Sequence, residues 1–343
     1  MHSMIRTTLM VLALLPGPIV YAQTTIKIAT VAPEGSSWVR EMRAGSDAIK
    51  TATEGRVQFR YYPGGVMGSD APAVLRKIKL GQLQGAALNS TELSQVDPDA
   101  QILTLPFLFE SEAEIQAVRK TIDPLLRASI ESKGMAVLGV ADGGFAYLMS
   151  TRPIRTKQEL AATKVWAPQG DMVSIRTFEA GGVRPVTLPT ADVYVALSTG
   201  LVETVGNSPS GAIIFQWHTR LKQMIDLPMT VLMGYLVVDG KVFARISASD
   251  QLIVREEMNR VFERIGKNNR RDNVSAREVL VKQGIEIVAS APEQQAEWVA
   301  VGRTAIDELV KEGAFTPAML KSVNDAIAAY RAAHRSTGAT PAS

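Results

Sequence analysis

Short apolar runs alternate with amphipathic segments of helical length along most of the 343-residue chain. Runs such as Ile26–Thr30, Val57–Tyr62 and Ala136–Ala141 predict strands, whereas segments 70–80 and 115–130 predict helices. This alternation is typical of an α/β sheet whose strands are largely parallel and buried on both faces. The chain therefore predicts the α/β fold class.

A second alternation begins near residue 145 and shows no sequence repeat of the first. Its helices are predicted to begin at Asp171 and Thr190. A chain of this length suffices for about two domains of roughly 150 residues. Two α/β lobes joined by a hinge therefore explain the pattern. The strands expected in the second alternation are 164–166, 183–188 and 202–205.

The C-terminal third has the pattern of helices. Residues 249–283 contain no proline and a single glycine, and apolar side chains from Val254 to Ile265 follow one helical face. The polar segment 268–273 (NNRRDN) interrupts that stripe. We interpret this segment as a solvated helix face that crosses between the lobes, with a functional basic patch as the alternative. Two more amphipathic helices are predicted within 292–330.

The first 22 residues have the pattern of a secretory signal peptide. Arg6 precedes an apolar run at 9–15, and the segment Val20-Tyr21-Ala22 offers small residues for cleavage after Ala22. A membrane anchor is the alternative, but the run is shorter than the about 20 residues that cross a bilayer. We therefore expect an exported protein of the bacterial periplasm, with a mobile tail at 336–343.

Composition excludes several kinds of chemistry. The chain has no cysteine, which rules out disulfides and thiolate chemistry, and its only histidines are His2, His218 and His334. No nucleophile elbow, phosphate loop or dinucleotide fingerprint occurs. The formal net charge of +3 is too small to indicate a polyanion partner. We expect no catalytic residue, no metal site, no cofactor and no nucleic-acid partner.

Polar and aromatic side chains gather where predicted strands end. Open α/β sheets bind ligands beyond the carboxyl ends of their strands, and two lobes with such ends facing each other form a cleft. Core packing explains any one of the aromatic rings alone, but together they favour a binding cleft. Asp171 is interpreted as a helix cap, with contact to a ligand cation as the alternative. The candidate ligand-binding residues are Trp38, Asn89, Phe145, Tyr147, Trp166, Asp171 and Asn207.

Several motifs, in order, resemble one family. Segment 62–68 (YPGGVMG) resembles its characteristic turn, and Leu105-Pro106-Phe107 matches a further landmark. The strongest match runs from Val183 through Asp192-Val193-Tyr194 to Asn207. Over about residues 25–335 the chain resembles the extracytoplasmic substrate-binding proteins of tripartite ATP-independent periplasmic (TRAP) transporters.

The resemblance implies a two-lobed fold that closes on its ligand, with a hinge and a long C-terminal helix bridging the lobes. It implies a small organic solute as ligand, no catalysis, and delivery by a monomer to the membrane subunits of a TRAP-type permease driven by an ion gradient. The alternatives are a sensory subunit of the same fold that presents its ligand to a kinase, and an exported enzyme. The lobes expected are 23–143 with about 234–276, and 144–233 with about 277–335.

One departure from the family concerns the ligand. Most relatives bind a carboxylate through an Arg at the position of Trp166, and some use another Arg at the position of Ala146. A Trp supplies one N–H and a ring face in place of the bidentate Arg fork. We therefore expect short dicarboxylates to bind weakly and a less charged, more apolar solute to bind better. Asn207 matches a site residue of the family, and Asn89 lies where some relatives have a polar contact.

Overall fold

A computed structural model describes residues 23–335, and the predicted signal peptide and C-terminal tail lie outside them. The main sheet has the strand order β10-β8-β4-β9-β3-β1-β2, with β7 paired to β4, and β5 and β6 form a separate pair. The strands are β1 Thr24–Thr30, β2 Val57–Tyr62, β3 Gly85–Asn89, β4 Met135–Ser150, β5 Trp166–Pro168, β6 Val186–Leu188, β7 Thr204–Asn207, β8 Gln223–Asp226, β9 Thr230–Asp239 and β10 Glu286–Ala289.

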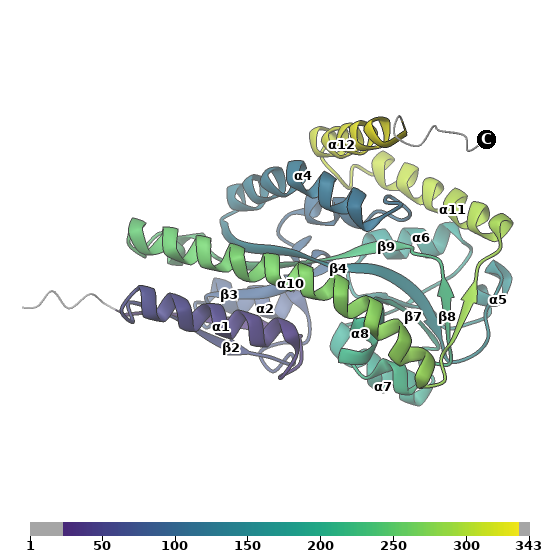
Figure 1. The fold of residues 1–343 in the computed structure, drawn as a ribbon, viewed down its shortest axis with the longest axis horizontal. Helices are drawn as coiled ribbons and strands as arrows, with labels where there is room; N and C mark the ends of the chain where they lie inside the picture. The colour runs from purple at the N-terminus through teal and green to yellow at the C-terminus, as the bar shows by residue number, and fades with distance from the viewer. Residues whose placement is uncertain (1–22, 336–343) are drawn as a thin grey trace, which may run out of the picture.

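Helices cover this sheet on several sides (Figure 1). Within the described range, no helix is both long enough and apolar enough to cross a membrane. The α-helices are α1 Ser37–Ala52, α2 Ala71–Lys79, α3 Ser90–Leu93, α4 Glu112–Ser132, α5 Lys157–Ala161, α6 Met172–Ala180, α7 Val193–Thr199, α8 Pro209–Ile214, α9 Gly240–Phe243, α10 Ala248–Lys282, α11 Pro292–Lys311 and α12 Pro317–Arg335, with 3-10 turns η1 Pro98–Thr104, η2 Thr190–Asp192 and η3 Trp217–Thr219.

The strand directions differ from the largely parallel sheet that the sequence predicts. β1 is parallel to β2 and β3, and β8 is parallel to β10. β9, in contrast, is antiparallel to both β3 and β4, and β4 is antiparallel to β7 and β8. The prediction is wrong here because strands buried on both faces are continuously apolar whichever way they run. The sheet is mixed.

β4 is one strand of 16 residues, where the sequence predicts a strand that ends at Ala141 and a new alternation near residue 145. Its pairing with β9 shifts register between Val137 and Gly139 and again between Asp142 and Gly144. Gly144 has φ +81°, which a residue with a side chain rarely adopts. Beyond this second bulge β4 pairs with β7 and β8, so a single strand links the two parts of the sheet.

α10 is a continuous helix of 35 residues, about 50 Å long at 1.5 Å per residue. It packs against α1, β4 and α8, so it runs along both parts of the molecule (Figure 1). The polar segment 268–273 does not interrupt it, and its predicted solvation is wrong for Asn269, which is buried. The side-chain amides of Asn269 and Asn273 donate to the carbonyls of Asp142 and Gly143, which the second bulge of β4 leaves available.

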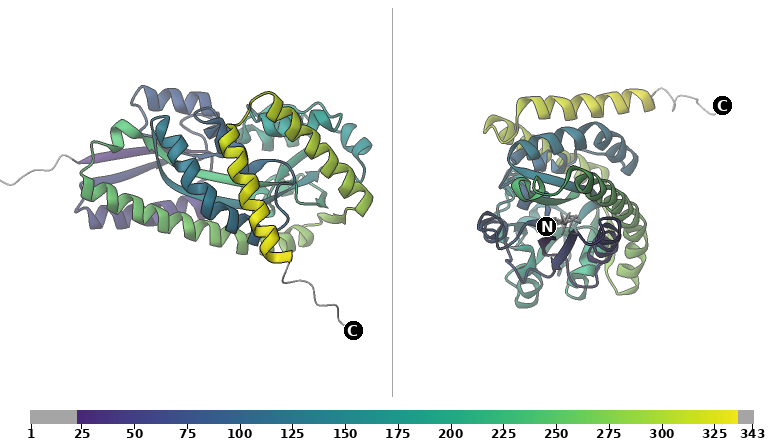
Figure 2. Two further views of the ribbon diagram at one scale, coloured as in Figure 1. Left: turned by 90° about the horizontal axis from the view of Figure 1, so that it is seen from above. Right: turned by 90° about the vertical axis from the view of Figure 1, so that its left-hand side faces the viewer.

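The last two helices pack on different parts of the molecule. α11 packs against α6, whereas α12 packs against α4 and η1. Figure 2 shows α12 lying across the outer side of α4. Met319, Val323 and Ile327 of α12 join the apolar cluster that includes Ile115 and Ile122 of α4. The predicted division assigns α12 and α4 to different lobes, and the lobe boundaries stay a prediction.

Candidate functional site

A cavity of about 280 Å³ lies where several strands of the fold end. Thr30 ends β1, Asn89 ends β3, Pro168 ends β5 and Asn207 ends β7, and all four line it. Its floor comes from residues 229–234 at the start of β9 and from the middle of β4. The site thus lies at the carboxyl ends of strands, as the sequence predicts.

Four helices begin at this cavity. Their N-cap residues Ser36, Asn89, Asp171 and Ser208 line it and cap α1, α3, α6 and α8. In each cap the side-chain oxygen accepts a hydrogen bond from a backbone N–H of the first turn, at 2.8 to 3.4 Å. The caps explain why short polar side chains lie at the cavity wall. Each one accepts a hydrogen bond from a backbone N–H at a helix start that would otherwise face the cavity without a partner.

The structure brings six of the seven predicted site residues together. Phe145 is the exception: it packs against the apolar cluster that contains Ile115 of α4 and Val231 of β9. Ala146, the next residue along β4, takes a cavity-facing position in its place. Phe145 and Tyr147 are two residues apart, so a regular strand would place both rings on one face, and the sequence does not reveal that only Tyr147 lines the cavity. The six that line the cavity are Trp38, Asn89, Tyr147, Trp166, Asp171 and Asn207.

Trp38 and Trp166 offer the cavity only their ring surfaces. Their N–H groups are not available to a ligand, because both are already hydrogen-bonded within the protein. Trp38 Nε1 donates to Asn269 Oδ1 at 3.2 Å, and Trp166 Nε1 donates to the Leu188 carbonyl at 3.0 Å. Trp166 is 5% exposed and meets Trp217 edge to face, with ring centroids 5.3 Å apart. The sequence analysis counts the Trp166 N–H as a donor that could replace the Arg fork, but this N–H is bonded to Leu188.

Trp38 also depends on a glycine. A Cβ at Gly234 would lie 2.5 Å from its ring, so only glycine lets this ring lie against β9. The ring meets Phe262 of α10 edge to face, with centroids 5.9 Å apart. The indole is thus held from three sides, by β9, Phe262 and the amide of Asn269.

Asn89 and Asn207 are oriented in the same way. Asn89 Oδ1 accepts from the Glu92 N–H at 2.8 Å, and Asn207 Oδ1 accepts from the Ser208 N–H at 2.8 Å. These bonds assign the amide orientation. Among the described residues, no protein group accepts a hydrogen bond from either side-chain NH2 group, and both residues line the cavity. Each therefore keeps two N–H donors for a bound molecule.

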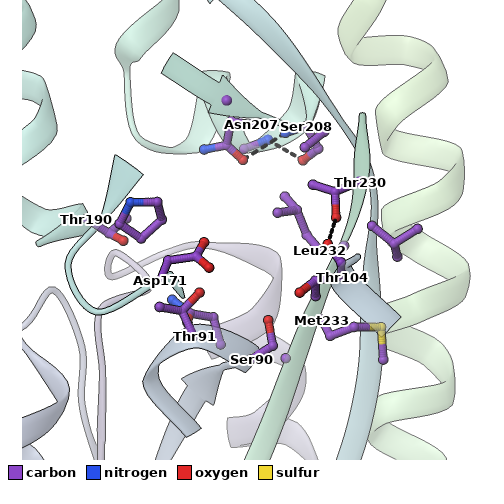
Figure 3. Close-up of a pocket in the computed structure, with 18 of the residues that line it drawn as sticks. Ser90, Thr91, Thr104, Asp171, Thr190, Asn207, Ser208, Thr230, Leu232 and Met233 are labelled. Carbon is purple, nitrogen blue, oxygen red and sulfur yellow. Dashed lines mark hydrogen bonds between the residues drawn. The ribbon is translucent and has the colours of Figure 1, made fainter. Parts of the chain in front are cut away.

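Asp171 caps α6, as the sequence predicts, and it also contacts η1. Its Oδ1 accepts from the Ser174 N–H at 3.1 Å and from Gln101 Nε2 at 2.6 Å. Its Oδ2 accepts from the Ser174 hydroxyl at 2.6 Å. Figure 3 shows Asn207 and Ser208 on one side of the cavity, Ser90 and Thr91 on the other, and Asp171 between them. Of the cavity-lining residues that the structure describes, Asp171 alone carries a charged side chain, and no Lys, Arg or His lines the space.

Tyr147, which lines the cavity, and Glu92, which caps Asn89 beside it, have shifted pKa values. Burial raises the pKa of Tyr147, whose ring lies beneath the Arg277 guanidinium at 5.4 Å from the ring centroid. Burial also raises the pKa of Glu92 to about 7. Glu92 completes the capping box with Asn89 by accepting from its backbone N–H at 2.9 Å. The capping box that orients Asn89 thus contains a carboxyl whose pKa lies above its usual value.

Sequence reasoning missed several lining residues. Ser90 and Ser208 directly follow two predicted residues, so their helix-start positions were the available signal. Asn269 continues the steps of three or four residues that Val261 and Ile265 set, which places it on the buried face of α10. The lining residues not predicted include Ser36, Ser90, Thr91, Thr190, Ser208, Phe215, Trp217 and Asn269.

Comparisons with known proteins agree on the family and the fold. A family model described as bacterial extracellular solute-binding protein, family 7, matches residues 28–312. The 2,3-diketo-L-gulonate-binding periplasmic protein YiaO of Escherichia coli K12 is 27% identical over 163 residues, 46% of this chain and 48% of that protein. The chain thus matches about half the length of that relative.

Two solved structures share the fold. A TRAP periplasmic solute-binding protein of Xanthobacter autotrophicus Py2 with bound β-D-galacturonate has a TM-score of 0.81 at 23% identity, covering 88% of this chain and 99% of that one. Another, from Haemophilus influenzae RdAW with bound L-gulonate, has a TM-score of 0.82 at 18% identity, covering 89% and 100%. The predicted fold class, a two-lobed α/β binding-protein fold with a long C-terminal helix, is confirmed.

Proposed function

Because the chain belongs to the bacterial extracellular solute-binding proteins of family 7, we propose that it captures a small organic solute in the cavity and delivers it to a TRAP-type membrane permease. The family consists of binding proteins, not enzymes. The signal-peptide pattern of residues 1–22 supports capture in the periplasm by an exported protein. That the protein acts as a monomer is part of the proposal. The two structures above are described as TRAP periplasmic solute-binding proteins, which supports transport over the sensory role.

The observation that carries the proposal is the cavity itself. It is lined by segments from both predicted lobes, including Asn89 and Thr104 from the first and Trp166 and Asn207 from the second. The hydrogen bond from Gln101 to Asp171 crosses between these segments. A space that lies between two lobes can widen or narrow when the lobes move about a hinge, as in hinged binding proteins.

The lining limits the kind of solute. The two structural neighbours and YiaO are described with sugar acids, which supports an organic solute of similar size for this chain. Yet the cavity-lining residues between 23 and 335 include no cationic side chain. The family resemblance implies that Trp166 occupies the position where most relatives have an Arg. We therefore propose a solute with no more than one carboxylate and a largely apolar body, and weak binding of succinate or malate.

The test uses protein stripped of ligand by unfolding and refolding. It is screened by thermal shift against galacturonate, gulonate, succinate, malate and a set of amides and amines. A solute that binds only the folded state raises the melting temperature, by an amount that grows with its concentration. The best binder should also contract the protein in small-angle X-ray scattering. A tight binder that leaves the scattering profile unchanged would contradict closure, and micromolar binding of succinate would contradict the proposed solute.

A further inference from the structure

The carboxylate of Asp171 has room for one more donor. A carboxylate offers about four acceptor positions. The two at Oδ1 are taken by Gln101 and the Ser174 N–H, and one at Oδ2 is taken by the Ser174 hydroxyl. All three donors are neutral, so they orient the carboxylate without neutralising it. Asp171 is 7% exposed and lines the cavity, so the remaining acceptor position is available to a molecule bound there.

The opposite side of the cavity offers donors. Asn207 is 8% exposed, and its side-chain NH2 group has no acceptor among the described residues although its oxygen is bonded to Ser208. A Cβ at Gly211 would lie 2.2 Å from Asn207 Oδ1, so glycine at this position leaves the room that the amide occupies. Asn89 presents a second NH2 group in the same way. A buried amide that retains free donors fits a ligand that supplies an oxygen acceptor.

Nearby guanidinium groups cannot compensate Asp171, since each one is paired elsewhere. Arg176 of α6 pairs with Glu179 and Glu312, and Arg277 pairs with Asp226. Arg270 pairs with Asp142. A second negative charge in the cavity would therefore face Asp171 with no cation at the wall. An ammonium group, in contrast, would be attracted by Asp171 and by the faces of the surrounding aromatic rings.

From these contacts we infer that the solute carries an N–H donor, as an ammonium or amide group, which Asp171 binds, and a carbonyl or carboxylate oxygen, which Asn89 and Asn207 bind. The inference rests on the proposed function and makes it more specific. A solute with both groups has a net charge between +1 and −1, and it satisfies the open acceptor and the open donors at once. The aromatic rings of Trp38, Trp166 and Phe215 contact the apolar body between them.

The experiment compares matched solutes by calorimetry. One set has a four-carbon skeleton: succinate, succinamate and 4-aminobutanoate. The other is aromatic: benzene-1,3-dicarboxylate, 3-carbamoylbenzoate and 3-(aminomethyl)benzoate. In at least one set, the amide or amine should bind at least about tenfold more tightly than the diacid, because a charge-assisted hydrogen bond is gained and a charge repulsion is avoided.

Two variants assign the effect. Asp171→Asn retains a good N-cap and removes the charge, so the preference for the amine over the diacid should fall by about tenfold or more. Asp70→Asn makes the same change at the N-cap of α2, outside the cavity, and should leave the preference unchanged. A diacid that binds tightest, or a preference that survives in Asp171→Asn, would overturn the inference while leaving the proposed function standing. If no solute of either set binds, the inference is also overturned. The proposed function is then tested separately by the binding of galacturonate and gulonate in the thermal-shift screen.

Discussion

Asp142 and Asp171 are both buried carboxylates, but their surroundings are opposite. Asp142 lies at the second bulge of β4 and accepts hydrogen bonds from Arg119 at 2.5 Å and from Arg270 at 3.1 Å. Gln116 adds a third donor at 3.0 Å. Asp171 lies at the cavity and has only neutral donors. The protein thus compensates one buried charge with its own guanidinium groups and leaves the other without a cation.

The difference separates a structural carboxylate from one that is available to a ligand. Arg119 belongs to α4 and Arg270 to α10, so Asp142 connects both helices to the strand between them. It also lies beside the carbonyls that Asn269 and Asn273 hold, and these amides contact Trp38 and Ser210 at the cavity wall. Compensated charge therefore fixes the link between the two parts of the molecule, and uncompensated charge lies at the cavity where we propose that a solute binds.

The largest expected effect comes from breaking the compensated site. Asp142→Ala leaves Arg119 buried, with 11% of its side chain exposed, and without its shortest ion pair. We expect the free energy of unfolding to fall by about 3–5 kcal/mol, as measured by urea denaturation. Asp142→Asn, which keeps an acceptor for the same donors, should cost less. A loss below about 1 kcal/mol for Asp142→Ala would mean that water or Asp123, which also pairs with Arg119, replaces the carboxylate.

A smaller effect is expected at the donor side of the cavity. Asn207→Ala removes a buried donor pair and leaves the bound oxygen of the solute without a partner. Binding of the best solute from the matched sets should weaken by about 1–3 kcal/mol in calorimetry. Asn268→Ala is the control, since Asn268 bonds to Glu41 and does not line the cavity. Unchanged affinity in Asn207→Ala would remove Asn207 from the binding site.

The local features of this fold could be predicted from the sequence. The strands at 26–30 and 57–62 and the helix that begins at Asp171 follow from apolar runs, caps and glycines. Each of these signals acts over a few residues. The position of the cavity followed from the same reasoning, because strand ends and helix starts meet there.

The remaining features depend on partners distant in the sequence. Strand direction and the bulge at Asp142 are set by pairing between β4 and β9, about 90 residues apart. The N–H of Trp166 is consumed by Leu188 of the adjacent β6, which no local pattern reveals. Likewise, Asp171 is recognised as a cap from its own helix, but its contact with Gln101 and its lack of a cation appear only when the cavity is assembled.

The half-buried carboxyl of Glu92 sharpens the comparison through its dependence on pH. Glu92 forms no ion pair among the described residues, and burial raises its pKa to about 7. The folded protein therefore holds a proton that the unfolded chain releases near pH 4.5, so its stability falls as pH rises from about 4.5 to 7. The slope from this group does not exceed about 1.4 kcal/mol per pH unit.

Glu92→Gln tests this assignment, because the amide does not titrate. The melting temperature of the variant should decline less than that of the unaltered protein between pH 5 and pH 8. Glu159→Gln is the matched control, since Glu159 completes the same capping box with Thr156 at an exposed site. Parallel pH curves for Glu92→Gln and the unaltered protein would show that Glu92 is ionised throughout this range.

The smallest effect is expected where a charge is paired but not buried. Asp226 accepts two hydrogen bonds from Arg277 at 2.8 and 2.9 Å, and the two side chains are 41% and 31% exposed. Water can replace the partner at such a site, so Asp226→Asn should lower the free energy of unfolding by less than about 1 kcal/mol in urea denaturation. The Arg277 guanidinium lies over the ring of Tyr147, and this contact does not require Asp226. A loss as large as that of Asp142→Ala would mean that ion pairing, rather than burial, decides how much each of these carboxylates contributes to the free energy of unfolding. The contrast between Asp142 and Asp171 would then lose its physical basis.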